Sequence, residues 1–131
     1  RKDNFNYLTE KLQNLTQHLI LPQPTIDSEP SWFGYPITIR DQKIERTELI
    51  KHLDKHKIGT RLLFSGNLTK QPYFKDQKYR VFGSLENTDK VMNKTLWLGI
   101  YPALGERQLD FISETMECFL TNKKITITTD L

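Results

Sequence analysis

Apolar residues recur every three or four positions in four stretches of the chain, a spacing that places them on one face of a helix. The first such set runs from Phe5 to Leu19. In the third stretch, Asn87 or Thr88 is the expected N-cap. The four predicted helices cover residues 4–20, 46–57 and 88–94, and a last stretch that begins at Gly105 or Glu106.

Other stretches alternate apolar and less apolar residues, which predicts strands with one buried face. Pro36 lies inside the first of them and favours an edge position or a bulge, because proline cannot donate a ladder hydrogen bond. The almost continuously apolar stretch over residues 96–101 is expected to be a central strand. The predicted strands cover residues 32–40, 60–64 and 96–101, with a short fourth one around Ile125 and Ile127. Helices alternating with few strands indicate an α+β fold, with a small mixed or antiparallel sheet and helices packed on one face.

Length, charge and composition narrow the class of protein. The 131 residues fit one domain, and no apolar run approaches the roughly 18 residues of a membrane span. The 19 lysine and arginine residues are interleaved with 16 acidic ones, so the net charge of +3 forms no basic stripe of the kind that binds nucleic acid. The single cysteine, Cys118, excludes an internal disulfide and a cysteine-only metal cluster, and a cytoplasmic location is expected.

His52 and His56 stand four residues apart and share a helix face, as metal-binding histidine pairs do. No third ligand is evident in the sequence, and lysines and an aspartate surround the pair. We therefore expect a solvated helix face here and no metal site.

The segment from Ser65 to Glu86 is too long for an ordinary connection and too aromatic for a solvated linker. The strand before it delivers Arg61, and the chain then turns at Ser65-Gly-Asn67, where glycine allows a ligand to approach the backbone. Arginine and lysine bind phosphate, and aromatic rings such as that of Tyr73 stack on a base or a sugar. The segment is therefore interpreted as an ordered binding loop. A loop that packs on its own domain, with Arg61 in a structural salt bridge, is equally compatible with these residues.

Five short motifs occur in a fixed order along most of the chain. They are Ser31-Trp-Phe-Gly-Tyr-Pro36, Thr60-Arg-Leu-Leu-Phe-Ser-Gly-Asn-Leu-Thr-Lys-Gln-Pro-Tyr-Phe74, Tyr79-Arg-Val81, Asn87-Thr-Asp89 and Trp97-Leu-Gly-Ile-Tyr-Pro102. Together they resemble the C-terminal segment of the CDP-4-keto-6-deoxy-D-glucose 3-dehydrase branch of the DegT/DnrJ/EryC1/StrS sugar aminotransferase family, over about residues 1–120. The chain also begins without methionine, and the helical spacing of its apolar residues starts within the first few positions. We therefore expect residues 1–131 to be one domain of a longer enzyme.

The resemblance implies the small C-terminal domain of the type I fold of pyridoxal-phosphate enzymes, with the large cofactor-binding domain absent from this chain. It implies a parent enzyme that removes the C3 hydroxyl of a CDP-linked 4-keto-6-deoxy sugar for deoxysugar and O-antigen lipopolysaccharide biosynthesis. The PLP or PMP cofactor and a [2Fe–2S] cluster would belong to the large domain, electrons would come from a flavin/iron–sulfur reductase, and the parent would be a homodimer. The isolated chain is accordingly expected to be inert and to bind no cofactor of its own.

The same resemblance, together with the residue chemistry, assigns substrate contacts to this chain. The expected contacts are Phe33 as an apolar wall, Arg61, Asn67 and Arg80 as polar contacts, and Lys70 as a phosphate contact. No residue is assigned to catalysis, because His18, His52 and His56 do not match the context of the family's catalytic histidine. The alternative role of the five contact residues is stabilisation of the long loop itself.

Three other functions remain compatible with the sequence. A free-standing α+β ligand-binding module predicts small-molecule affinity by the isolated chain. A single-stranded nucleic-acid binder predicts strongly salt-dependent affinity for oligonucleotides, which the scattered charge disfavours. A sister sugar aminotransferase or dehydratase that acts on a different nucleotide would differ from the 3-dehydrase in its large domain.

Overall fold

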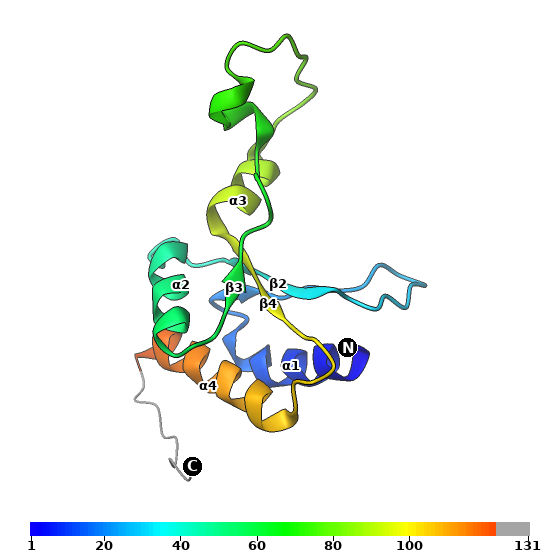
Figure 1. The fold of residues 1–131 in the computed structure, drawn as a ribbon, viewed down its shortest axis with the longest axis vertical. Helices are drawn as coiled ribbons and strands as arrows, with labels where there is room; N and C mark the ends of the chain where they lie inside the picture. The colour runs from blue at the N-terminus through cyan, green and yellow to red at the C-terminus, as the bar shows by residue number, and fades with distance from the viewer. Residues whose placement is uncertain (123–131) are drawn as a thin grey trace.

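Four helices and one four-stranded sheet make up the part of the chain that the computed structural model describes, residues 1–122 (Figure 1). The helices are α1 (Lys2–Leu12), α2 (Arg46–Lys55), α3 (Glu86–Lys94) and α4 (Glu106–Thr121). The strands are β1 (Leu19–Ile20), β2 (Gly34–Ile39), β3 (Thr60–Arg61) and β4 (Thr95–Gly99). The strands pair in the order β1-β2-β4-β3, and every pair is antiparallel. No helix among these residues is long and apolar enough to cross a membrane.

Helices α1, α2 and α4 cover one face of the sheet, and the core lies between them and the strands (Figure 1). Alternate residues of the two central strands point into this core, namely Tyr35, Ile37, Ile39, Leu96 and Leu98. Facing them are helix residues spaced three or four apart, among them Phe5, Leu8 and Leu12 on α1, Leu49 and Leu53 on α2, and Leu109, Ile112 and Met116 on α4. Apolar residues thus recur every second position in the strands and about every 3.6 positions in the helices, and both sets of side chains meet in a single core.

This architecture confirms the predicted α+β fold with helices on one face, and the sheet is antiparallel rather than mixed. The apolar strand β4 is central, as its composition indicates. Strand β1 pairs only with Thr38 and Ile39, so Pro36 has a partner strand on one side alone, and its predicted edge position is confirmed locally. The strand predicted around Ile125 and Ile127 lies outside the described residues.

The prediction of one continuous helix over residues 4–20 is wrong in its second half. Helix α1 ends at Leu12, the 3₁₀ turn η1 (Gln13–Leu15) follows, and Leu19 begins strand β1. Leu19 is fully buried, as the pattern requires, but it pairs with Ile39 across the sheet. The apolar pattern correctly identifies Leu19 as buried. Its strand conformation depends on pairing with Ile39, which is distant in sequence.

Other boundaries also differ from the prediction, by one or two residues in β2, α2 and β4. Helix α3 begins at Glu86, with Leu85 as an N-cap that makes no side-chain hydrogen bond, so neither Asn87 nor Thr88 caps it. Strand β3 holds only Thr60 and Arg61, and the chain leaves the sheet there. The prediction of a strand to residue 64 is therefore too long.

Residues 62–85 form a projecting segment, here termed the arm. The arm extends away from the helices together with α3 (Figure 1). It contains the two 3₁₀ turns η2 (Leu68–Lys70) and η3 (Pro72–Phe74). The long segment predicted from the sequence is thus a structured extension that projects away from the sheet (Figure 1).

Candidate functional site

The face of the sheet opposite the helices presents a row of side chains across three strands. Trp97 of β4 pairs with Pro36 of β2 on one side and with Arg61 of β3 on the other. Directly paired residues of an antiparallel sheet point to the same face. The neighbours of Trp97 along the strand, Leu96 and Leu98, point into the core. Pro36, Trp97 and Arg61 therefore lie side by side on the helix-free face.

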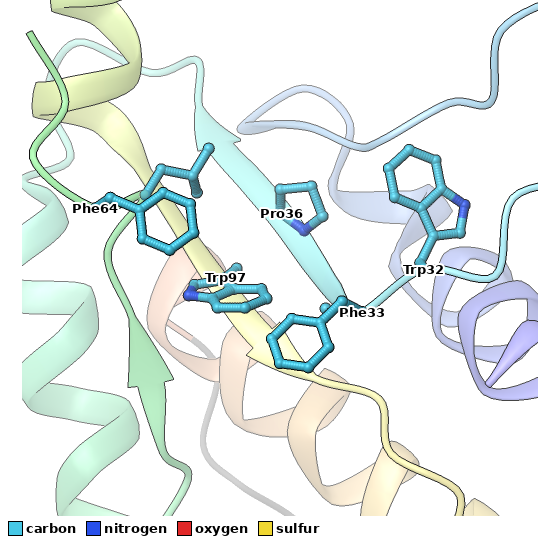
Figure 2. Close-up of a pocket in the computed structure, with 7 residues that line it drawn as sticks. Trp32, Phe33, Pro36, Phe64 and Trp97 are labelled. Atoms are coloured by element: carbon cyan, nitrogen blue, oxygen red, sulfur yellow. The ribbon is translucent and has the colours of Figure 1, made fainter.

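Trp97 forms the floor of an apolar cavity on this face (Figure 2). Its indole ring lies over Gly34, where an added Cβ atom would come within 1.9 Å of the ring atom Cε3. The ring centroids of Phe33 and Phe64 are 5.1 Å and 6.4 Å from that of the indole. Phe33 and Phe64 are 71% and 87% exposed, so the cavity opens to solvent. This cavity of about 290 Å³, here termed the aromatic pocket, is lined by Trp32, Phe33, Gly34, Pro36, Leu63, Phe64 and Trp97.

Arg61 adds a positive charge beside the aromatic pocket. Its side chain is exposed, and it forms no ion pair with another described residue, so the structural salt bridge considered above is not seen there. The guanidinium of Arg1 lies 5.7 Å from the centre of the Phe33 ring. The structure thus brings two predicted contact residues, Phe33 and Arg61, to one face. This face can bind a ligand that combines an anionic group with a flat apolar part.

The arm is aromatic and basic. The Phe74 ring contacts those of Tyr73 and Tyr79, with centroid distances of 6.0 Å and 4.9 Å. Four of the chain's 19 lysine and arginine residues and one of its 16 acidic residues lie in the arm, so its net charge equals the +3 of the whole chain. The predicted contact Arg80 lies exposed here, with no ion pair to a described residue. The arm is therefore the electropositive part of the molecule, which attracts anionic ligands.

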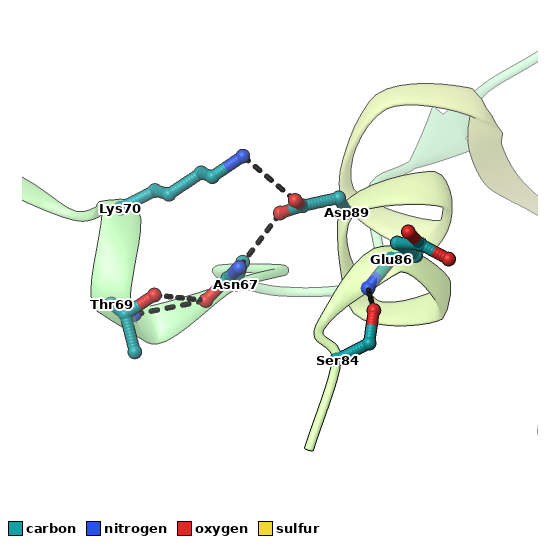
Figure 3. A network of polar contacts seen from close by, with 6 residues as sticks. All are labelled: Asn67, Thr69, Lys70, Ser84, Glu86 and Asp89. Atoms are coloured by element: carbon teal, nitrogen blue, oxygen red, sulfur yellow. Dashed lines mark hydrogen bonds and ion pairs between the residues drawn. The ribbon is translucent and has the colours of Figure 1, made fainter. Parts of the chain in front are cut away.

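The predicted contacts Asn67 and Lys70 have partners inside the protein (Figure 3). Asn67 is buried, its Oδ1 accepts hydrogen bonds from the backbone and hydroxyl of Thr69, and its Nδ2 donates one of 2.7 Å to Asp89. Lys70 Nζ forms an ion pair of 2.8 Å with Asp89. The bonds from Lys70 and then from Asn67 hold the pKa of the Asp89 carboxyl below its usual value. Both residues thus stabilise the arm, and substrate contact by either one stays a prediction.

Three residues that organise this site, Trp97, Phe64 and Asp89, are not among the contacts predicted from the sequence. Trp97 lies in a continuously apolar strand, a pattern that indicates core on both faces. Phe64 falls in the predicted extension of β3, and Asp89 belongs to a quoted motif without a role. The fit of Trp97 over Gly34 depends on the register between β2 and β4, which the sequence does not specify. A glycine between two aromatic residues, Phe33 and Tyr35, was the available signal.

His52 and His56 do not form the solvated helix face expected from the sequence. Both are half-buried, and His52 Nε2 lies 3.2 Å from the carbonyl oxygen of Thr115 on α4. The two ring centroids are 4.5 Å apart. Burial, with a contribution from His56, lowers the pKa of His52. Among residues 1–122, no three metal-ligating side chains come together.

Residues 1–117 match the family model of the DegT/DnrJ/EryC1/StrS aminotransferase family. The chain belongs to this family. This family member is 54% identical to the lipopolysaccharide biosynthesis protein RfbH of Salmonella typhimurium strain LT2 over 120 residues. The matched region makes up 91% of this chain and 28% of RfbH. The family part of the resemblance that the motifs indicated is thereby confirmed.

Two further relatives are named as sugar 3-dehydratases. The dTDP-4-dehydro-2,6-dideoxy-D-glucose 3-dehydratase of Saccharopolyspora spinosa is 40% identical over 121 residues, covering 92% of this chain and 26% of the relative. The solved structure of E. coli GDP-4-keto-6-deoxy-D-mannose-3-dehydratase with bound hydrated PLP has a TM-score of 0.77 and 25% identity, covering 87% of this chain and 29% of that one. The family member described here thus spans less than a third of the length of each of these relatives.

Proposed function

We propose that this family member is the C-terminal small domain of a PLP-dependent nucleotide-sugar 3-dehydratase of deoxysugar and lipopolysaccharide biosynthesis. The observation that carries the 3-dehydratase assignment is the 40% identity to the Saccharopolyspora spinosa 3-dehydratase over 92% of the chain, and the 54% identity to RfbH supports the role in lipopolysaccharide biosynthesis. Its proposed substrate is a CDP-linked 4-keto-6-deoxy sugar. A large domain outside this chain would hold PLP or PMP and a [2Fe–2S] cluster, accept electrons from a reductase and form a homodimer.

The aromatic pocket does not itself hold a side chain suited to the phosphate group of PLP. The aromatic pocket is lined by apolar side chains and glycine, with no hydroxyl or cationic side chain to bind a phosphate. The proposal accordingly keeps the cofactor in the large domain. No chemical step is therefore assigned to these residues.

Within such an enzyme, this domain would bind the nucleotide sugar and help to close the active site. The exposed guanidinium of Arg61 can bind a phosphate through two hydrogen bonds. Phe33 and the aromatic pocket beside it offer apolar surface to a sugar or a base. Lys70 and Arg80 place positive charge along the arm, which favours the approach of a diphosphate. The arrangement supports a role in substrate binding.

Substitution Arg61→Ala in the full-length enzyme tests this role. A charge-assisted hydrogen bond contributes about 1.5–3 kcal/mol, so its loss should raise KM for the nucleotide sugar roughly 10- to 100-fold. Arg40→Ala is the matched control. Arg40 is also an exposed arginine, but it follows the C-terminal end of β2, whereas Gly34 at the N-terminal end of β2 lines the aromatic pocket. Equal kinetics for the two variants would remove Arg61 from the substrate contacts.

The family's name supports a second candidate function, the transfer of an amino group to a nucleotide sugar. The two activities give different products from a 4-keto sugar nucleotide. A 3-dehydratase with a reductase gives a 3-deoxy sugar, whereas an aminotransferase gives an amino sugar and consumes an amino-acid donor. Mass spectrometry of the product formed by the full-length enzyme separates the two.

A further inference from the structure

A polar cluster fastens the base of the arm to α3 (Figure 3). The side chain of Asn67, only 2% exposed, accepts two hydrogen bonds at Oδ1, of 3.0 Å from the Thr69 backbone and 2.7 Å from the Thr69 hydroxyl. Its Nδ2 donates to Asp89 Oδ1 at 2.7 Å, while Lys70 approaches the other carboxylate oxygen at 2.8 Å. Asn67 thus links the backbone of the arm to a carboxylate on α3. Its burial leaves little surface for a ligand.

Close packing reinforces the polar cluster at the neighbouring residue. Gly66 has a φ of +62°, and a Cβ atom there would lie 2.5 Å from Cβ of Met92. The backbone of the arm therefore touches α3 directly beside the Asn67–Asp89 hydrogen bond. Helix α3 is in turn tied to α2, because Nη1 of Arg46 donates to the carbonyl oxygens of Met92 and Thr95. The arm is consequently anchored to the folded core through α3.

The segment between this anchor and the sheet carries the residues of the proposed site. Arg61 is fixed in the sheet by its pairing with Trp97, and Asn67 is fixed at α3, six residues later. Between them, Phe64 flanks the aromatic pocket with a φ of +49°, a conformation that is uncommon for a bulky residue and that persists only where the surroundings enforce it. Losing the hydrogen bond at Asn67 would weaken the second attachment, which limits the movement of Phe64 and the base of the arm.

From this geometry we infer that Asp89 is a positioning residue, which acts through Asn67 to hold the base of the arm where the nucleotide sugar binds. The inference rests on the proposed function for its substrate, but the anchor itself is a property of the described fold. In this role, Asn67 fixes the position of the residues of the arm on either side of it. Lys70 contributes less to the anchor, because its ion pair with Asp89 is partly exposed to solvent.

Three variants of the full-length enzyme test the inference. Asp89→Ala removes the carboxylate that pairs with both Asn67 and Lys70, and it leaves the Nδ2 group of the buried Asn67 without its acceptor. Asp89→Asn keeps an oxygen acceptor for Asn67 but loses the charge that pairs with Lys70, so it is the milder variant if Asp89→Ala folds poorly. Glu86→Ala is the matched control, since Glu86 is an exposed acid on the same helix whose side chain points away from Asn67 (Figure 3).

Two readouts are compared, the kinetic constants with the nucleotide sugar and hydrogen–deuterium exchange of residues 65–71 followed by mass spectrometry. We expect Asp89→Ala to raise KM about tenfold with kcat and the PLP absorbance within about twofold of wild type, because a displaced arm weakens binding and leaves the cofactor site intact. The amides of residues 65–71 should exchange at least about threefold faster. Asp89→Asn should fall between wild type and Asp89→Ala, and Glu86→Ala should match wild type.

The inference is overturned if Asp89→Ala changes neither KM nor exchange by more than about twofold, or if Glu86→Ala has the same effect. An unchanged KM with faster exchange would overturn the role in substrate binding. The exchange measurement needs no substrate, so it also separates the inference from the proposed function. A wild-type enzyme without PLP or turnover would refute the proposed function and the substrate role together, while faster exchange in Asp89→Ala would still assign the anchor to Asp89.

Discussion

Substitution Gly34→Ala tests the arrangement of the aromatic pocket, because Gly34 supports the indole of Trp97. The new Cβ would lie 1.9 Å from Cε3 and 2.4 Å from Cζ3 of that ring, whereas ordinary contact begins at 3.4 Å. The ring must therefore retreat by about 1.5 Å. Overpacking of this kind costs about 1–3 kcal/mol. Reduced freedom of the unfolded chain offsets about 0.4–1 kcal/mol, so we expect a net loss of about 1–2 kcal/mol in the free energy of unfolding.

Urea unfolding of the 131-residue protein, followed by circular dichroism, measures this loss. Gly59→Ala is the matched control, because no atom lies within 4 Å of a Cβ at Gly59, and we expect it to be neutral or stabilising. In a Trp97→Ala background the clash is gone, so Gly34→Ala should no longer destabilise the protein. The reasoning is refuted if Gly34→Ala behaves like Gly59→Ala, or if its cost is the same with and without Trp97.

Two further predictions concern stability, both measured by urea unfolding. Asn67→Ala should lower the free energy of unfolding by about 1–3 kcal/mol, because it leaves the half-buried polar groups of Thr69 and Asp89 without this partner. Lys70→Ala should cost less than about 1 kcal/mol, as for other exposed ion pairs, and equal costs for the two variants would contradict the anchor. The lowered pKa of His52 means that the unfolded chain binds more protons than the folded one just below the usual value of 6.5. Stability should therefore fall on acidification from about pH 7.5 to about 5.5, and His52→Gln should flatten this dependence, while an unchanged slope would assign it to other groups.

Local patterns predicted the elements of this fold better than their ends. Helix α4 begins where expected, because Gly105 precedes it and Gln108 accepts a hydrogen bond from the Gly105 backbone three residues earlier. Leu19 was placed in a helix because helical spacing and a buried strand residue look alike over so short a stretch. Its pairing with Ile39 is a contact between residues far apart in sequence, which no local pattern contains.

In the candidate site too, the sequence indicates the chemistry of single residues but not how they are arranged in space. Arginine and phenylalanine indicated anion binding and an apolar wall, and the strand register brings Phe33 and Arg61 to one face through Trp97. Asn67 was predicted as a substrate contact from its residue type and its place in a motif. The structure shows its amide bonded within the protein, because the turn at Gly66 carries Asn67 beneath the surface and against Asp89, and its contact with substrate stays a prediction.

We propose that the enzyme to which this chain belongs is a PLP-dependent 3-dehydratase with an iron–sulfur cluster. The most direct test of this proposal is the near-ultraviolet and visible absorption spectrum of the purified full-length enzyme. We predict a band of pyridoxal- or pyridoxamine-type cofactor together with the broad envelope of an iron–sulfur cluster. A protein that is colourless, and stays so after addition of pyridoxal phosphate, would refute the proposed function.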